Sequence, residues 1–465
     1  MTQLRGGMLL ASPWTPRLTD GAGSPGERLV EALARDIADG SLPPGARLPA
    51  HRPLAWQLRI GLGTVTKAYA QLERRGLVRS VRGRGMFVAG ITHAASRMVD
   101  LSINVPPQAL SDRLLAACLG DLARRLDADS FGAYAAPAGR LEHRALLARW
   151  LAQTGVPAAP ERLLICNGAQ HALAIALAIT CGPDTELLTE ALSYPGAIAL
   201  ARRRGLRLTG LVIDEQGLVP QALEQALHRA QAAGRRAVFY VTPTLHNPTT
   251  ATMGEVRRRE IARLCRAHDA VIVEDDIHAA LAEPGTIPIA SLAPERTLHV
   301  SGLSKVLSPG LRIGSLLVPE AWLEPALAEL AATCTTAPLL SCLIMERWLA
   351  DGTAASVSRS IRDEAGRRVA LARVTLPPEI AIRSGSGFHL WLPMAPDRAR
   401  ALPARAAASG ILLPAPEAFL ADAQAPASGV RLSLGGPGID ALAGALASLR
   451  ALLLDGGGAA TRVTP

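Results

Sequence analysis

Lysine is scarce in this 465-residue sequence, aromatic residues are few and paired cysteines are missing. Lys67 and Lys305 are the only lysines among 49 basic residues, and aromatic residues make up 3%. The six cysteines are scattered without a CxxC pair, which argues against a disulfide framework and the usual zinc-ligand spacing, so we predict no metal site. Because arginine is the basic residue almost everywhere, each of the two lysines needs its own explanation.

The sequence also lacks a long apolar run and a signal-peptide pattern. Its longest apolar stretch, around residues 172–181, is much shorter than the about 20 residues that span a bilayer. Glycine and proline interrupt the apolar pieces of residues 1–24. We therefore expect a cytoplasmic protein without membrane contact, with a mobile N-terminal extension at 1–24 and a mobile tail at 454–465. Hydrophobic residues reach 49%, which excludes disorder over most of the chain.

Basic residues are concentrated in residues 25–90. This segment holds eleven basic and five acidic residues, so it carries +6 of the net charge of +9. Its apolar spacing predicts helices at 27–39, 52–58 and 62–75, followed by short strands at 77–81 and 86–88 around Gly83-Arg84-Gly85. A short helix, a turn and a second helix can place the second helix in the major groove of DNA.

Residues 25–90 resemble the winged helix-turn-helix domain of the GntR regulator superfamily. The resemblance implies a double-stranded DNA operator as partner. It implies DNA contacts from Arg52, Thr64, Thr66, Lys67, Arg82 and Arg84. The family usually starts the recognition helix with a Ser-Arg pair, whereas Gly61-Leu62 stands here. We expect this departure to alter DNA affinity or operator choice.

A linker is expected at 91–111, and from residue 112 onward helical and apolar strand patterns alternate. The strand candidates are 162–166, 186–190, 207–213, 237–243, 270–276 and 297–302. The alternation predicts an α/β domain over 112–453 with a mostly parallel sheet and helices on both faces. Residues 381–453 read as strand–helix–strand–helix and predict a smaller α+β lobe.

The second lysine, Lys305, directly follows a predicted strand in a turn rich in glycine, serine and proline. It is either structural or an amine that forms a Schiff base. Arg312 can bind a phosphate bidentately, and residues 167–170 open a helix whose N–H groups can bind a phosphate. Asp275, at the end of an apolar strand, needs a cationic partner such as a protonated pyridine nitrogen.

In this order, these motifs resemble the fold-type I pyridoxal 5′-phosphate (PLP) aminotransferases over residues 100–453. The resemblance implies that Lys305 forms an internal aldimine with PLP, Asp275 binds the ring nitrogen and Asn247 binds the ring hydroxyl oxygen. It implies that Tyr194 stacks on the ring and that Arg431 clamps a substrate carboxylate. It assigns the phosphate to Gly168, Ala169, Gln170, Ser304, Arg312 and, from a neighbouring subunit, Tyr134.

Several positions depart from the aminotransferase pattern. The tyrosine expected shortly after the aspartate is replaced by Ile277, and the serine three residues before the lysine by Gly302. Thr250 replaces a glycine, and 104–106 reads Asn-Val-Pro in place of a glycine-containing loop. We expect weakened cofactor anchoring and turnover beside an intact Schiff-base lysine.

The two halves together resemble the MocR family of bacterial regulators. The resemblance implies a homodimeric transcriptional regulator whose aminotransferase-like domain senses PLP or an amino-acid or amine effector. One alternative is a catalytically active PLP-dependent aminotransferase acting on an amino acid, which the retained Lys305, Asp275, Asn247 and Arg431 favour. A second alternative is a GntR-type regulator whose large domain is a PLP-free scaffold.

Overall fold

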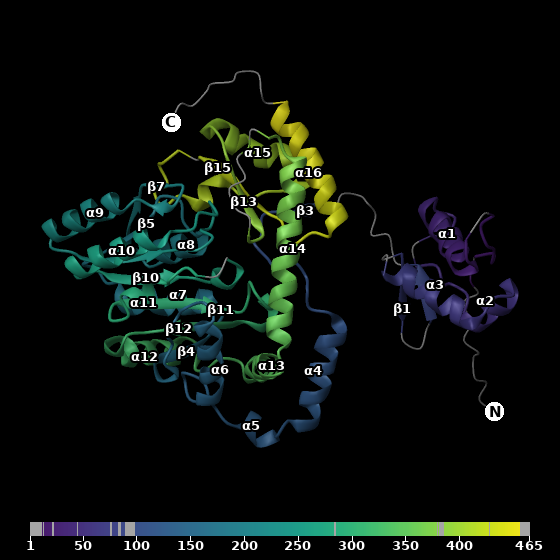
Figure 1. The fold of residues 1–465 in the computed structure, drawn as a ribbon, viewed down its shortest axis with the longest axis horizontal. Helices are drawn as coiled ribbons and strands as arrows, with labels where there is room; N and C mark the ends of the chain where they lie inside the picture. Colours follow the sequence, from purple (N-terminus) through teal and green to yellow (C-terminus); the bar gives the residue numbers. More distant parts are fainter. Residues whose placement is uncertain are drawn as a thin grey trace, which may run out of the picture. The chain divides into compact units, whose positions relative to one another are not determined.

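The computed structural model describes residues 12, 14–20, 23–43, 45–74, 77–81, 85–88, 98–282, 285–378, 380, 386–426 and 428–455. The chain divides into two compact units, Met1–Arg97 and Met98–Pro465, which we call the head and the body (Figure 1). Each unit has its own hydrophobic core, so each is described by itself.

The head consists of three helices followed by a two-stranded antiparallel sheet. The elements are α1 (Pro25–Ala38), α2 (His51–Leu58), α3 (Leu62–Arg74), β1 (Val78–Val81) and β2 (Gly85–Val88). Ser24 and Glu27 form a capping box that begins α1. Leu29 and Leu33 of α1 are fully buried in one cluster with Val65 of α3. This is the winged helix-turn-helix arrangement that the sequence predicts.

The head begins earlier than the sequence suggests. Trp14 is only 6% exposed and belongs to the head core, and its Nε1 donates to Asp36 Oδ2 at 2.7 Å. Arg17 pairs with the other carboxylate oxygen of Asp36. The expectation of a mobile extension is therefore wrong for residues 14–20. A single buried tryptophan has no periodicity, so the sequence pattern does not reveal its burial.

A seven-stranded sheet forms the centre of the body, in the order β4-β12-β11-β10-β9-β5-β6 (Figure 1). The strands are β4 (Leu163–Asn167), β5 (Thr185–Glu190), β6 (Arg207–Leu211), β9 (Arg236–Val241), β10 (Val271–Asp275), β11 (Thr297–Gly302) and β12 (Ile313–Leu317). The sheet is parallel except for β12, which runs antiparallel to both of its neighbours. The prediction of a mostly parallel sheet is confirmed, although β12 was not among the expected strands.

Helices pack on both faces of this sheet because its strands alternate their apolar side chains. On β9, Val238 and Tyr240 face the side covered by α7 (Ala169–Thr180), α8 (Pro195–Arg203) and α12 (Leu323–Cys334). Phe239 and Val241 face the side covered by α9 (Pro220–Ala232), α10 (Glu255–Ala267) and α11 (Ile289–Leu292). The α/β architecture expected from the sequence is present.

A third cluster of buried residues surrounds one edge of the sheet. It joins β4 and β12 to α4 (Asp112–Arg125), α6 (Leu141–Ala152), α13 (Leu339–Ala350) and α14 (Thr353–Thr375). The short helix α5 (Ala128–Gly132) follows α4 at the periphery (Figure 1). Among the described residues, no helix is long and apolar enough to cross a membrane, and no three metal-ligating side chains come together.

The smaller lobe pairs β13 (His389–Pro393) with β15 (Gly429–Ser433) and packs them against α14, α15 (Pro396–Ala408) and α16 (Ile439–Leu454). A short strand, β3 (Val99–Asp100), pairs with β14 (Ile411–Leu412), and Leu101 is fully buried in the same core. The expected linker at 91–111 is therefore too long, because residues 98–111 belong to the body.

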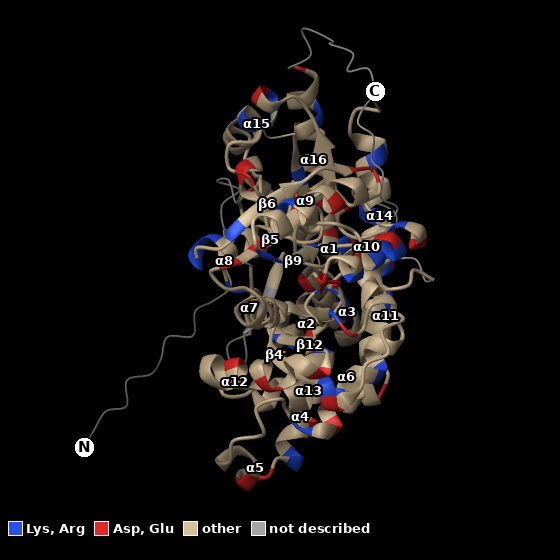
Figure 2. Cartoon of the chain, turned by 90° about the vertical axis from the view of Figure 1, so that its left-hand side faces the viewer, with Lys and Arg blue, Asp and Glu red and all other residues tan. Residues whose placement is uncertain are grey.

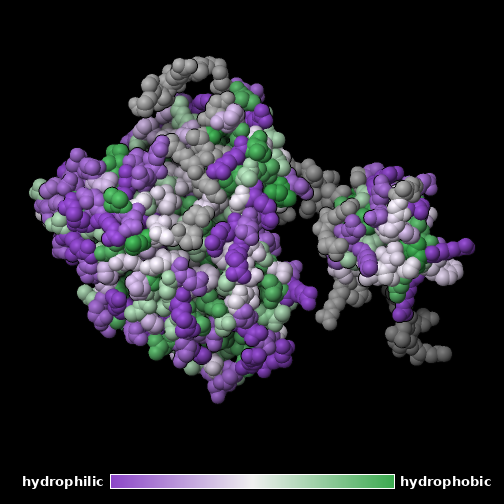
Figure 3. Space-filling view, in the orientation of Figure 1, coloured by the Kyte–Doolittle hydropathy of each residue, from purple (hydrophilic) through white to green (hydrophobic). Residues whose placement is uncertain are grey.

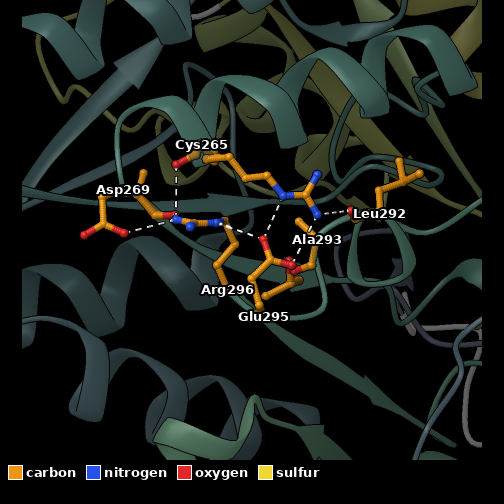
Figure 4. A network of polar contacts seen from close by, with 9 residues as sticks. Cys265, Asp269, Leu292, Ala293, Glu295 and Arg296 are labelled. Atoms are coloured by element: carbon orange, nitrogen blue, oxygen red, sulfur yellow. Dashed lines mark hydrogen bonds and ion pairs between the residues drawn. The ribbon is translucent and has the colours of Figure 1, made fainter.

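The body surface carries charges of both signs, which are interspersed on α10 (Figure 2). In one network, Glu295 Oε1 accepts from Arg266 Nε at 2.8 Å and from Arg296 Nε at 3.2 Å, and Arg296 also pairs with Asp269 (Figure 4). The bond from Arg266 lowers the pKa of Glu295 to about 2. Exposed ion pairs of this kind contribute little stability, so we assign this network no functional role.

Candidate functional site

A cavity of about 620 Å³ lies in the body, at the carboxyl ends of parallel strands. In an α/β sheet this edge is the usual place of ligand sites. Nine of the eleven residues that the sequence assigns to PLP or substrate line the cavity: Ala169, Gln170, Tyr194, Asn247, Asp275, Ser304, Lys305, Arg312 and Arg431. The structure thus brings together residues that are up to 262 positions apart in the chain.

Lys305 follows β11 and points its amine into the cavity. Its Nζ donates a hydrogen bond to the backbone oxygen of Asn104. Burial lowers the pKa of Lys305 to about 8, and repulsion from Arg431 adds to the shift. The neutral amine, which is the nucleophilic form, is therefore accessible near neutral pH.

Asp275 is the last residue of β10 and is buried at the wall of the cavity, with 6% of its surface exposed. Its Oδ2 accepts a hydrogen bond from the hydroxyl of Tyr240 at 2.9 Å, whereas its Oδ1 is buried without a partner among the described residues. Burial raises the pKa of Asp275 to about 6. A buried carboxylate with one free oxygen fits a ligand that presents a cationic N–H donor. Tyr240 was not predicted, because a tyrosine inside an apolar strand looks like a core residue.

The first turn of α7 forms the anion-binding end of the cavity. Gly168, the N-cap of α7, has a φ of 82°, and a Cβ there would lie 2.3 Å from Arg312 Nη2. Arg312 Nη2 donates to the oxygen of Asn167 at 3.2 Å, which holds the guanidinium beside the helix N-terminus. Gln170 Oε1 is buried without a partner among the described residues. N–H groups and a guanidinium together suit a phosphate.

Arg431, on β15, also lines the cavity. Its Nη1 donates to Asn247 Oδ1 at 2.9 Å, its Nη2 donates to the oxygen of Ser102, and its guanidinium lies 4.9 Å from the ring centroid of Phe419. Burial lowers the pKa of Arg431 to about 10. The guanidinium remains a cation that can bind a carboxylate. Ser102 was not predicted, because it binds Arg431 through its backbone oxygen and a backbone oxygen has no sequence signature. Phe419 was not predicted either.

The expected departures also have positions in the structure. Ile277 lines the cavity, and so does the next residue, His278, which sequence reasoning missed. Burial and the surrounding cationic groups hold the pKa of His278 well below its usual value, so the ring is neutral. Gly302 lies opposite Gly314, where a Cβ would be 2.8 Å from the oxygen of Ile313. No side chain fits there, so the missing serine follows from the close packing of β11 on β12.

Thr250 adopts a φ of 66°, in the left-handed region that favours glycine, and its N–H donates to the oxygen of His246 at 2.7 Å. The turn is therefore kept without the glycine. Two of the predicted residues do not line the cavity. Gly168 directly precedes the lining residue Ala169, and Tyr134 follows α5, where it is 87% exposed.

The described DNA-contact candidates lie on two helices of the head. Arg52 is exposed on α2, and Thr66 and Lys67 are exposed on α3, where Thr64 is half-buried. Arg82 and Arg84 lie outside the described residues. Trp56, which was not singled out from the sequence, is 82% exposed on α2.

Comparison with known families divides the chain in the same two parts. The family "Bacterial regulatory proteins, gntR family" matches residues 25–88, and the family "Aminotransferase class I and II" matches residues 96–437. The chain is 26% identical over 454 residues to YdeF, an uncharacterized HTH-type transcriptional regulator of Bacillus subtilis, with 95% of this chain and 97% of that protein covered.

A second relative is the vitamin B6 salvage pathway transcriptional repressor PtsJ of Salmonella typhimurium. It is 27% identical over 438 residues, covering 89% of this chain and 94% of PtsJ. Among solved structures, the kynurenine aminotransferase of Pyrococcus horikoshii matches with a TM-score of 0.71 and 20% identity, covering 78% of this chain and 93% of that one, and it shows the shared fold. A GntR helix-turn-helix joined to an aminotransferase class I and II domain is the MocR architecture, and the chain belongs to this family of transcriptional regulators.

Proposed function

We propose that the body binds pyridoxal 5′-phosphate in the cavity around Lys305 and that its occupancy changes how the head binds DNA. The observation that carries this proposal is the convergence of Lys305, Asp275 and Arg312 in one cavity. An amine with a lowered pKa, a carboxylate with a free oxygen and a guanidinium at a helix N-terminus match three different groups of that cofactor. The name of PtsJ, which refers to vitamin B6 salvage, supports the same cofactor.

Each residue has a definite task in this site. When PLP binds, Lys305 would supply the amine, Asp275 Oδ1 would hold the protonated ring nitrogen, and the N–H groups at the start of α7 would bind the phosphate together with Arg312. Tyr194 offers its ring for stacking, and Asn247 offers its amide N–H to the ring hydroxyl oxygen. The cofactor supplies an aldehyde that condenses with primary amines and a ring that withdraws electrons from them.

We further propose an effector that carries an amine and a carboxylate. Arg431 is a buried cation beside the cavity, and its Nε has no partner among the described residues. An effector can switch DNA binding only if it binds two states of the protein with different affinity. The alternative of an active aminotransferase rests on the same residues and makes a different prediction, namely repeated turnover with a keto acid.

We also propose that the protein forms a homodimer and acts in the cytoplasm. The peripheral α4–α5 region exposes a set of apolar side chains that a second copy would cover: Leu114, Leu115, Leu119, Leu126, Phe131 and Tyr134. Contiguous exposed apolar residues are typical of protein interfaces. A two-fold dimer would also present two heads to a paired operator.

The proposal is tested by titrating the protein onto the DNA upstream of its own coding sequence, with and without PLP. We expect PLP to change the affinity or footprint of the wild type and to change neither for Lys305→Ala. Val256→Ala, at an 84% exposed position on α10 outside the cavity and the head, serves as the control. An identical affinity and footprint for the wild type with and without PLP would exclude the sensor. Repeated conversion of amino acids with a keto acid would instead establish an enzyme.

A further inference from the structure

Residues 102–104 line the ligand cavity, and their backbone oxygens accept hydrogen bonds from two of its cationic side chains, Lys305 and Arg431. Arg431 Nη2 donates to the oxygen of Ser102, and Lys305 Nζ donates to the oxygen of Asn104. The side chain of Asn104 also lies against His278, with 3.4 Å between Nδ2 and Nε2. We call residues 102–104 the strap. The amine and the guanidinium that the proposed function assigns to ligands are thus both engaged by one piece of backbone.

The strap is fixed at both ends, and within it the N–H and side chain of Ser102 bond only locally to Asp100, with the N–H donating to Asp100 Oδ1 at 2.8 Å. On one side, Leu101 exchanges two backbone hydrogen bonds of 2.9 Å, its N–H donating to Leu412 and its oxygen accepting from Ser433. On the other side, Val105 lies so close to Gly435 that a Cβ on that glycine would be 1.9 Å from the oxygen of Val105. The central residue of the strap, Ile103, is 59% exposed and covers no core.

Polar groups around the strap are incompletely satisfied. Asn104 is only 8% exposed, yet its Oδ1 has no partner among the described residues, and neither does Arg431 Nε. Buried polar atoms without partners cost free energy. The strapped arrangement therefore leaves one donor, Arg431 Nε, that a ligand carboxylate can satisfy, and one acceptor, Asn104 Oδ1, that a ligand N–H or O–H group can satisfy.

We propose that the strap is an internal competitor of the ligand, and that ligand binding displaces it from Lys305 and Arg431. The proposal rests on the PLP-binding function proposed above. The bond to Asn104 holds Lys305 Nζ toward the strap, so a ligand that draws Nζ to its own carbon competes with this bond. At Arg431 a carboxylate competes with the neutral oxygen of Ser102, and a charged acceptor makes the stronger bond.

The place of the strap in the chain gives its displacement a consequence. It follows directly after β3, and β3 is the first element of the body after the segment that connects to the head. Displacing residues 102–104 pulls on β3 and its pairing with β14. The strap therefore links occupancy of the cavity to the beginning of the body through covalent continuity alone.

The sign of one mutational effect tests this competition. Asn104→Ala removes the contact with His278 and so loosens the strap. We expect this variant to bind PLP about three- to tenfold more tightly than the wild type does, because the strapped state loses about one hydrogen bond. Ser102→Ala removes the bond of 2.6 Å from Ser102 Oγ to Asp100 and should act in the same direction. Thr375→Ala, which removes a comparable bond to Leu371 far along α14, should leave PLP affinity unchanged.

Affinity is measured by absorbance titration of the full-length protein with PLP, and folding by thermal unfolding without PLP. Hydrogen exchange adds a direct readout: PLP should accelerate exchange of the amides of 102–105 in the wild type and leave them unchanged in Lys305→Ala. Tighter binding by either strap variant, including binding seen only in the variants, supports the competitor. Lowered affinity would make Asn104 a ligand contact, and this result or unchanged affinity in both variants overturns the strap alone. Absence of PLP binding in the wild type and in all variants overturns the proposed function as well.

Discussion

Burial favours the neutral form of both reactive groups in the cavity. It raises the pKa of Asp275 to about 6 and lowers that of Lys305 to about 8. For the lysine this is an advantage, because the neutral amine is the nucleophile. For the aspartate it is a cost that a cationic ligand removes, since an opposite charge stabilises the carboxylate.

The cost at Asp275 predicts a stability difference that depends on pH. The pKa of Asp275 is higher in the folded than in the unfolded chain, so the folded state binds more protons between about pH 4 and pH 6 and loses stability as the pH rises through this window. Relative to the wild type, Asp275→Asn without PLP should gain on the order of 2–3 kcal/mol between pH 4 and pH 7. Unfolding midpoints at both pH values check this. A difference that does not change with pH would contradict it.

The scarcity of lysine makes the titration of Lys305 directly measurable. In a Lys67→Arg background Lys305 is the only side-chain amine of the protein. We expect the rate of PLP attachment, trapped with borohydride, to rise with pH around an apparent pKa of about 8, because burial disfavours the ammonium form. A midpoint near the usual value for lysine would mean that water reaches Nζ freely.

The residues of the site were predictable from the sequence only where they carry a distinctive type at a distinctive place. Lys305 stood out because lysine is rare, and Asp275 because it ends an apolar strand. Tyr240 and His278 did not stand out, because both look like packed residues until the topology brings them to the cavity. The oxygens of Ser102 and Asn104 belong to the backbone, which is identical at every residue.

At the scale of elements, the head depends on a segment that precedes its first helix. Trp14→Ala should remove about 3–5 kcal/mol from the stability of the head, since it deletes a buried indole and leaves Asp36 without one of its donors. Calorimetry of the full chain should show a lower transition for the head and an unchanged one for the body. Trp56→Ala, at an 82% exposed position, is the matched control and should change stability by less than about 0.5 kcal/mol.

Lys67 lies on α3, the expected recognition helix, where its side chain and that of Thr66 are exposed to solvent. If it contacts a phosphate, Lys67→Ala should weaken binding to all DNA sequences and flatten the dependence of log K on log salt by about one contact. Anisotropy titrations between low and high salt measure the slope. An unchanged slope would place Lys67 away from the backbone.

Most elements followed from periodicity, and the exceptions have physical reasons. The three helices of the head and the parallel strands of the body lie within a few residues of their predicted positions. Strand β12 was overlooked because it directly follows a turn with proline and glycine. Strand β3 has only two residues, and its partner β14 is more than 300 residues away, so no local signal exists.

For the whole molecule, the exposed apolar side chains of α4 and α5 predict self-association. Figure 3 shows hydrophobic residues among hydrophilic ones on the visible face of the body. Leu115→Asp with Leu119→Asp should convert a dimer into a monomer, since two charges would have to be buried at the interface. Light scattering after size exclusion gives the mass. Val256→Asp, at an 84% exposed position on α10, should leave it unchanged.

The anchoring of Trp14 in the head core also sets where the molecule can be cut for engineering. A family match that starts at residue 25 invites a graft of residues 25–88 onto another sensor domain. Such a graft would expose the core residues that Trp14 covers. It would also leave Asp36, which is 2% exposed in the complete head, without its indole donor. Small domains bury only a modest share of their surface, so the loss is large for a unit of this size. A transplantable head must therefore begin before Trp14.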